Sequence, residues 1–254
     1  MKKTLILFSL FAFPLAYSQE KKSDNGKLNL DILGSIGFTN YTNYPALNSL
    51  NDYFKSIGVN VDGSESTAPY YGVNVGASAL YSFYKTSIGY PVVGGGLSYV
   101  YATTDQSKTK YYTDGYTSNS KTGNTSSLFI DLYAGFNFTF IEQLKIFTLF
   151  NYGYSIYDKA SQSENFNIYL NSGLTIKSSL NNSYTVKNHQ KYGFTGICLY
   201  ELTNDIGIGA GLDINSHSFS ASGTSTYATG FSQNINQNST FAEVSARFIM
   251  SYSL

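Results

Sequence analysis

Apolar and polar residues alternate with a period of two along most of the chain beyond residue 27. The last segment shows this most clearly, because Val244, Phe248 and Tyr252 fall on one of its faces. The residues between them, which include Glu243 and Arg247, fall on the other face. A helix would mix the two sets, whereas successive side chains of a strand point to opposite faces. The pattern therefore predicts an all-β protein.

The alternation predicts eight strands, near residues 28–39, 71–84, 90–103, 128–140, 144–157, 191–202, 206–219 and 241–254. Short connections fall near residues 85–89, 141–143 and 203–205, and long polar loops fall near residues 40–69, 104–126, 158–190 and 220–239. An up-and-down barrel with an even number of strands has its short turns at one end and its long loops at the other. The connections therefore predict an eight-stranded antiparallel up-and-down barrel.

Composition indicates which face of this barrel points outward. Charged residues make up 13% of the chain and aromatic residues 17%, whereas soluble domains are typically ~25% charged. The polar strand positions are mostly Gly, Ser, Asn and Thr, which suit a narrow lumen, and the apolar positions include Phe136, Phe150 and Phe194. A soluble barrel with apolar residues inside is the alternative, but its outer face would need more charges. A transmembrane barrel with an outward apolar face is therefore favoured.

The final strand supports a resemblance to a known family of proteins. In strand number and loop asymmetry the chain resembles the eight-stranded OmpA/OmpX-type outer-membrane barrels of Gram-negative bacteria. These proteins usually end on an aromatic residue that apolar residues precede at alternate positions, a signal that the barrel-assembly machinery reads. Here Val244, Phe248, Met250 and Tyr252 are in place, but the chain finishes on Leu254. The resemblance implies an outer-membrane barrel without a periplasmic domain, with short turns in the periplasm and long loops outside the cell.

The first 18 residues have the pattern of a cleaved secretory signal peptide. Lys2 and Lys3 precede an apolar stretch, and Ala16 and Ser18 provide the small residues of a cleavage site. A membrane anchor is the alternative, but the stretch is too short to span a bilayer and Pro14 interrupts it. We therefore expect a signal peptide over residues 1–18 and a single barrel domain over residues 19–254.

Charge and cysteine content limit the possible partners. The 16 basic and 16 acidic residues give a formal net charge of zero, and Arg247 is the only arginine. This composition lacks the basic footprint of a nucleic-acid-binding protein. Cys198 is the only cysteine, so no internal disulfide and no thiolate metal cluster is expected. We expect no cofactor. The expected partners are membrane lipid, lipopolysaccharide, the barrel-assembly machinery and an unidentified extracellular partner.

Seven charged residues fall on the polar, inward set of the strands: Asp31, Asp131, Lys145, Glu201, Asp213, Glu243 and Arg247. A buried charge costs several kcal/mol unless it is paired. Arg247 and Asp213 lie at similar depths on neighbouring strands, and Glu243 shares a strand face with Arg247. The sequence therefore predicts a lumen cluster of Arg247 with Asp213 and Glu243, joined by Asp31 or Asp131. We interpret it as a plug, with an ion path or a ligand site as the alternatives.

An enzyme that modifies lipid A is the main functional alternative, and a narrow gated channel is the next. His217 lies near the loop end of its strand beside Ser218 and Ser220, with Asp213 on the same face, and these residue types suit acyl transfer. Their spacing is common in a chain so rich in serine, so a structural rim histidine is favoured. The soluble-enzyme motifs HExxH, GxSxG and CxxC are absent. We therefore predict a protein that is not an enzyme.

The long loops are then the expected place for surface interaction or envelope support. In the first loop, the spacing of apolar residues predicts an amphipathic helix over residues 45–58. Residues 62–65 of the same loop are interpreted as an ordinary turn rather than a calcium site. In the longest loop, apolar residues near Phe166 and Ile176 predict that the strands continue as a hairpin. His189 and Lys191 in that loop could attract lipopolysaccharide, although such residues are more often simply solvated.

Overall fold

The computed structural model describes residues 29–45, 67–84, 86, 88–113, 115–141, 143–228, 230 and 232–254. They form eight strands: β1 (Leu30–Pro45), β2 (Thr67–Ser82), β3 (Tyr90–Tyr112), β4 (Gly115–Ile141), β5 (Leu144–Leu170), β6 (Thr175–Glu201), β7 (Ile206–Tyr227) and β8 (Ser232–Ser253). The signal segment, the helix predicted in the first loop and the turn at residues 62–65 lie outside the described residues. No helix in the described part of the chain is long and apolar enough to cross a membrane.

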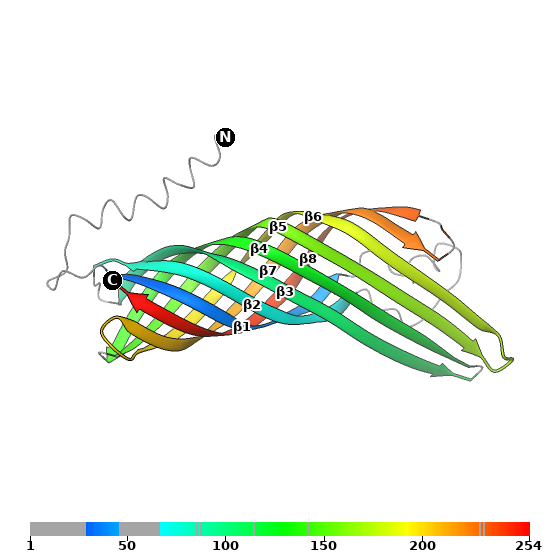
Figure 1. The fold of residues 1–254 in the computed structure, drawn as a ribbon, viewed down its shortest axis with the longest axis horizontal. Coiled ribbons are helices and arrows are strands. Elements are labelled where there is room, and N and C mark those ends of the chain that lie inside the picture. The colour runs from blue at the N-terminus through cyan, green and yellow to red at the C-terminus, as the bar shows by residue number, and fades with distance from the viewer. Residues whose placement is uncertain are drawn as a thin grey trace.

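The strands form a closed barrel in which each one pairs antiparallel with its neighbours in sequence (Figure 1). The ring is closed by β1 and β8, which pair from Asp31 opposite Ser253 to Thr42 opposite Ala242. The predicted eight-stranded up-and-down fold is therefore confirmed. Short connections join β2 to β3, β4 to β5 and β6 to β7 at the end where the C-terminus lies.

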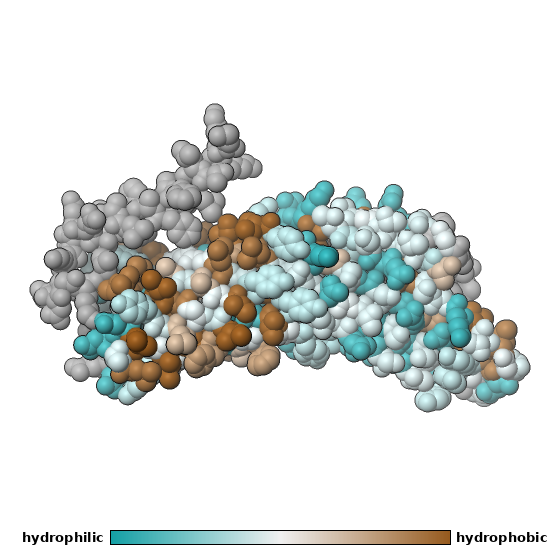
Figure 2. Space-filling model, viewed as in Figure 1, coloured by the Kyte–Doolittle hydropathy of each residue, from teal (hydrophilic) through white to brown (hydrophobic). Residues whose placement is uncertain are grey.

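The two faces of the strands differ as the alternation predicts. On β8, Val244 and Phe248 are 43% and 52% exposed, whereas Glu243 and Ser245 are buried in the lumen. Apolar side chains are exposed on the outer face of every strand and gather on the half of the barrel nearest the C-terminus (Figure 2). Cys198 is exposed on this outer face. The barrel therefore has the outward apolar band of a transmembrane barrel.

The long loops predicted at residues 104–126, 158–190 and 220–239 are wrong for most of their length, because the strands continue through them. β5 and β6 each contain 27 residues, although a strand needs only about 9–11 residues to cross a bilayer. The β3–β4 and β5–β6 hairpins reach furthest from the C-terminal end (Figure 1). The hairpin predicted near Phe166 and Ile176 is confirmed, with a turn at Gly173, whose φ is 87°. These segments looked like loops because Ser, Thr and Asn occupy both of their faces, which leaves no hydrophobic alternation.

In three strands, the set of alternate side chains that points into the lumen switches where the apolar band ends. On β6 the odd-numbered Lys191 and Thr195 face the lumen, but beyond a bulge at Asn188 the even-numbered Tyr184 and Val186 do. Asn188 has a φ of 52°, a left-handed conformation that asparagine tolerates. Irregularities at comparable positions in β1 and β5 have the same effect. A bulge adds one residue to a strand, so it moves the following side chains to the opposite face.

The change of the outer wall from apolar to polar along the barrel can be tested with two substitutions on β6. Phe194 is 68% exposed and lies between Phe150 and Ile214, whereas Ser183 is exposed beyond the bulge. We expect Phe194→Arg to lower the free energy of unfolding in lipid vesicles by about 2–4 kcal/mol, because it places a charge against lipid. Ser183→Arg should change it little, since that position faces water. Equal effects in urea titrations would contradict the placement of the band.

Candidate functional site

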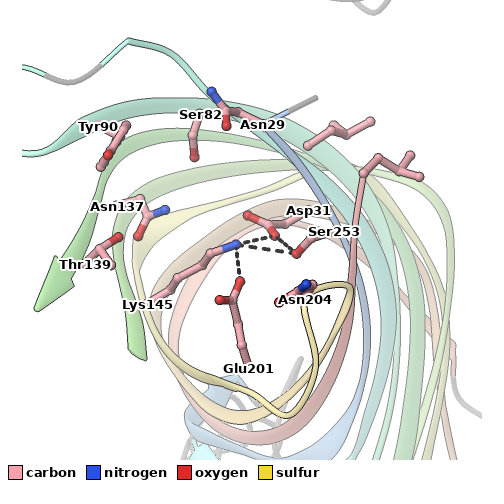
Figure 3. Close-up of a pocket in the computed structure, with 12 residues that line it drawn as sticks. Asn29, Asp31, Ser82, Tyr90, Asn137, Thr139, Lys145, Glu201, Asn204 and Ser253 are labelled. Carbon is pink, nitrogen blue, oxygen red and sulfur yellow. Dashed lines mark hydrogen bonds and ion pairs between the residues drawn. The ribbon is translucent and has the colours of Figure 1, made fainter. Parts of the chain in front are cut away.

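The lumen is filled by stacked layers of side chains, beginning with an ion-pair group at the short-turn end. Lys145 lies 3.0 Å from an oxygen of Asp31 and 2.8 Å from an oxygen of Glu201. Ser253 donates a hydrogen bond to Asp31, and the four side chains meet across a pocket of about 200 Å³ (Figure 3). Opposite charges from β1, β5 and β6 therefore hold this mouth of the barrel together.

An apolar layer lies next to the mouth and separates it from the middle of the barrel. Its buried members are Leu33, Leu80, Val92, Phe147, Leu149, Ile197, Leu199 and Ile249. They come from six of the strands, so the layer extends around the whole interior. Narrow eight-stranded barrels are commonly filled by their own side chains in this way.

Arg247 and Asp213 form a two-pronged ion pair beyond the apolar layer. Nε and Nη2 of Arg247 each lie 2.7 Å from one oxygen of Asp213. Asp213 also accepts a hydrogen bond of 2.6 Å from Thr195, which in turn accepts one from Asn151. Nη1 of Arg247 donates a hydrogen bond of 3.3 Å to Ser35 on the neighbouring strand β1. Because both charges are buried, this ion pair offsets much of the cost of burying them.

Lys191 and Asp131 form a second buried pair, with 3.1 Å between Nζ and the carboxylate. Ser98 bridges them, since it accepts from Lys191 at 3.0 Å and donates to Asp131 at 2.6 Å. Nζ also lies 4.4 Å from the centre of the Phe129 ring. Lys191 is therefore an interior residue and not a solvated loop cation, which corrects the expectation from sequence.

Two histidines link two carboxylates in a continuous hydrogen-bonded chain. Nδ1 of His189 lies 2.8 Å from Asp158, Nε2 of His189 lies 2.9 Å from Nδ1 of His217, and Nε2 of His217 lies 2.8 Å from Glu243. His217 is fully buried and His189 is 4% exposed, so His189 is not the solvated loop residue that the sequence indicated. The chain crosses the lumen from β5 through β6 and β7 to β8.

This chain requires a definite number of protons. Its three hydrogen bonds need three protons, and two neutral imidazoles supply only one each. Glu243 accepts further hydrogen bonds from Thr39, Asn215 and Ser245, which favour its ionised form. The third proton lies on the histidine pair if Asp158 is ionised as well.

Aromatic rings cover the histidine chain on the side toward the long hairpins. Phe241 stacks on His217 with 4.4 Å between ring centres, and the edge of Phe129 meets the ring of His189 at 4.9 Å. Tyr41 and Phe219 belong to the same buried cluster. These rings shield the hydrogen bonds from water, which strengthens them.

The five residues of the predicted lumen cluster are all buried, but they do not form one cluster. Glu243 and Arg247 are four residues apart on β8, which separates them by about 13 Å in an extended strand. Arg247 lies opposite Gly211 and pairs with Asp213, two residues further along β7. Glu243 lies opposite Asn215 and pairs with His217 by the same diagonal step. Asp31 and Asp131 pair with the lysines described above.

The residues of the acyl-transfer alternative are not brought together. His217 points into the lumen, while Ser218 and Ser220 lie on the outward set of β7, and Asp213 is held by Arg247. β7 thus places His217 and Asp213 on its inner face and Ser218 and Ser220 on its outer face. In the ranges that the structure describes, no group of three or more His, Cys, Asp or Glu side chains could hold a metal ion.

Comparisons with known proteins find similarity in structure only. No protein-family model and no curated protein matches the chain. The attachment invasion locus protein Ail of Yersinia pestis has a TM-score of 0.28 and 10% identity over 88% of this chain and 98% of Ail. The translocator domain of autotransporter NalP from Neisseria meningitidis has a TM-score of 0.25 and 12% identity over 100% and 98% of the chains. TM-scores this low carry no inference about the site or the function.

The Arg247–Asp213 pair should show strong coupling. We expect Arg247→Met and Asp213→Leu each to lower the free energy of unfolding by about 3–5 kcal/mol, because each leaves an unpaired buried charge. The double variant should lose much less than the sum, since it buries no unpaired charge. Urea titrations in detergent micelles measure the cycle, and heat-shifted gel migration checks that each variant folds. Additive losses would contradict the pairing.

The proton count of the histidine chain also gives a prediction. In ¹⁵N-histidine-labelled protein at neutral pH, we expect three slowly exchanging ring N–H signals from His189 and His217 by NMR. Glu243→Gln should leave two, because an amide N–H can donate to His217 and the additional proton is no longer needed. Two signals in the unaltered protein would refute the count.

Proposed function

We propose that this chain is an outer-membrane β-barrel protein of a Gram-negative envelope that acts in surface interaction or envelope integrity. It is a non-catalytic protein of the OmpA/OmpX type, inserted by the barrel-assembly machinery after its signal peptide is removed. One observation carries the proposal, which is the change of the outer wall from an apolar band to a polar surface along the same strands (Figure 2). A lipid bilayer accounts for the band, and water accounts for the rest.

The polar part of the barrel is large enough to be the working surface. A membrane crossing uses about 9–11 residues of a strand, so more than half of β5 and β6 extends beyond it. In the proposed orientation this extension projects from the cell and contacts lipopolysaccharide and an extracellular partner. Lys177 and Lys187 are exposed on it and can contact anionic groups.

The filled lumen supports a scaffold role over a channel. Two apolar clusters and the buried ion pairs occupy the interior between the short-turn end and the aromatic layer. Moving an ion along this path would require breaking pairs whose partners are otherwise left unsatisfied. The paired charges and packed rings instead hold a rigid wall on which the hairpins are carried.

Cysteine labelling of intact cells tests the proposed orientation. In a Cys198→Ser background, Ser172→Cys places a thiol in the exposed turn between β5 and β6, and Asn204→Cys places one at the opposite end of β6. A membrane-impermeant maleimide should label the first variant on whole cells and the second only after the outer membrane is permeabilised. The reverse pattern, or equal labelling, would refute the proposal.

A further inference from the structure

A groove of about 490 Å³ lies on the outer wall of β3, β4, β5 and β6. Two rows of outward side chains, each running across neighbouring strands, form it. The first row contains Thr103, Asn124 and Ser161, and the strand register places them side by side. The second row contains Thr122, Ser163 and Asn181. The groove is therefore a regular array of hydroxyl and amide groups.

The amide groups of this array keep hydrogen-bonding capacity. Ser161 donates to the side-chain oxygen of Asn124 at 3.2 Å, and Ser163 donates to that of Asn181 at 2.9 Å. Each bond uses one lone pair of the amide oxygen, whereas an amide also has two N–H donors. Within the described residues, neither amide nitrogen has a hydrogen-bond acceptor among the side-chain contacts. Donors and acceptors therefore alternate along an accessible surface.

The charge of the groove limits what can bind there. Asp105 is the only charged residue in its lining, which contains no lysine and no arginine. A phosphorylated or sulfated ligand would find no counter-charge among the lining residues and would meet this carboxylate. A lipid or an apolar peptide would find few apolar contacts, since Tyr101 is the only large apolar side chain in the lining.

An uncharged, hydroxyl-rich chain meets these conditions. Neighbouring strands of a β-sheet lie about 4.8 Å apart, a spacing close to the repeat of one sugar unit in an extended polysaccharide. Tyr101 is 41% exposed at one edge of the groove and offers a ring face for the C–H groups of a sugar. We propose that this groove binds an uncharged carbohydrate chain. The inference rests on the proposed function, because it requires this wall to lie outside the membrane.

Binding can be measured on the full chain, purified in detergent micelles, by isothermal titration calorimetry. The probes are dextran, mannan and the delipidated polysaccharide of the host outer membrane, with dextran sulfate as the charged comparison. Asn124→Leu combined with Asn181→Leu removes the two amides that belong to the outward rows of the groove. We expect at least one uncharged probe to bind and the double variant to bind it more than about tenfold more weakly, from two lost hydrogen bonds.

Asn238→Leu is the matched control. Asn238 accepts a hydrogen bond of 2.7 Å from Ser220 on the exposed wall of β7 and β8, which is the same pairing outside the groove. This variant should bind within about twofold of the unaltered protein, because it leaves the groove intact. Heat-shifted gel migration checks that all variants fold.

The results of these titrations answer two questions: whether the groove binds sugar, and where that sugar comes from. Binding of the host polysaccharide alone indicates a glycolipid of the same membrane, and binding of dextran or mannan indicates an external glycan. Absence of binding by dextran, mannan and the host polysaccharide, tighter binding of dextran sulfate, or equal loss in Asn238→Leu would overturn the inference. The assay uses isolated protein and does not depend on orientation. Its failure is therefore distinct from a failure of cysteine labelling.

Discussion

Closure of the β-sheet is the constraint on which the rest of this structure depends. In a bilayer every backbone N–H and C=O group must be paired within the protein, and a closed barrel achieves this without free edges. The pairing of β1 with β8 completes the ring from Asp31 to Thr42. Once the ring is closed, alternate side chains must point either to lipid or into a narrow lumen. The two sets of residues on each strand are thereby given opposite environments.

The narrow lumen then decides how its polar groups are paired. Strands are offset, so Arg247 and Glu243 each reach a partner two residues beyond the position opposite them on β7. The five residues that the sequence suggested as one cluster thus belong to separate contacts at different depths. The aromatic layer above His217 and His189 keeps water from these contacts. The packing of the lumen therefore stabilises the barrel and also fixes the positions of its charged groups.

Beyond the apolar band the same hydrogen-bonded strands continue, and their outer surface becomes polar. Bulges in β1, β5 and β6 shift the inward set, so the interior stays filled where the outer wall becomes hydrophilic. The extension is rigid because its residues remain paired between strands up to turns such as that at Gly173. A flat array of Ser, Thr and Asn side chains is the result, and a loop of the same composition would not hold such a pattern.

Hydrophobic alternation alone determined the strands of the apolar band, their inward and outward faces and the short turns. Arg247 and Asp213 could be matched from sequence because they lie at similar depths on adjacent strands. Only the tertiary structure decided that Glu243 pairs with His217, since this depends on strand offset, and that His189 faces inward, since β6 continues with the same alternation past residue 191, where the sequence predicted the strand to begin. Of the long hairpins, only the tip of the β5–β6 hairpin near Phe166 and Ile176 could be predicted from sequence. The other extensions have Ser, Thr and Asn on much of both faces, so the pairing between strands revealed them.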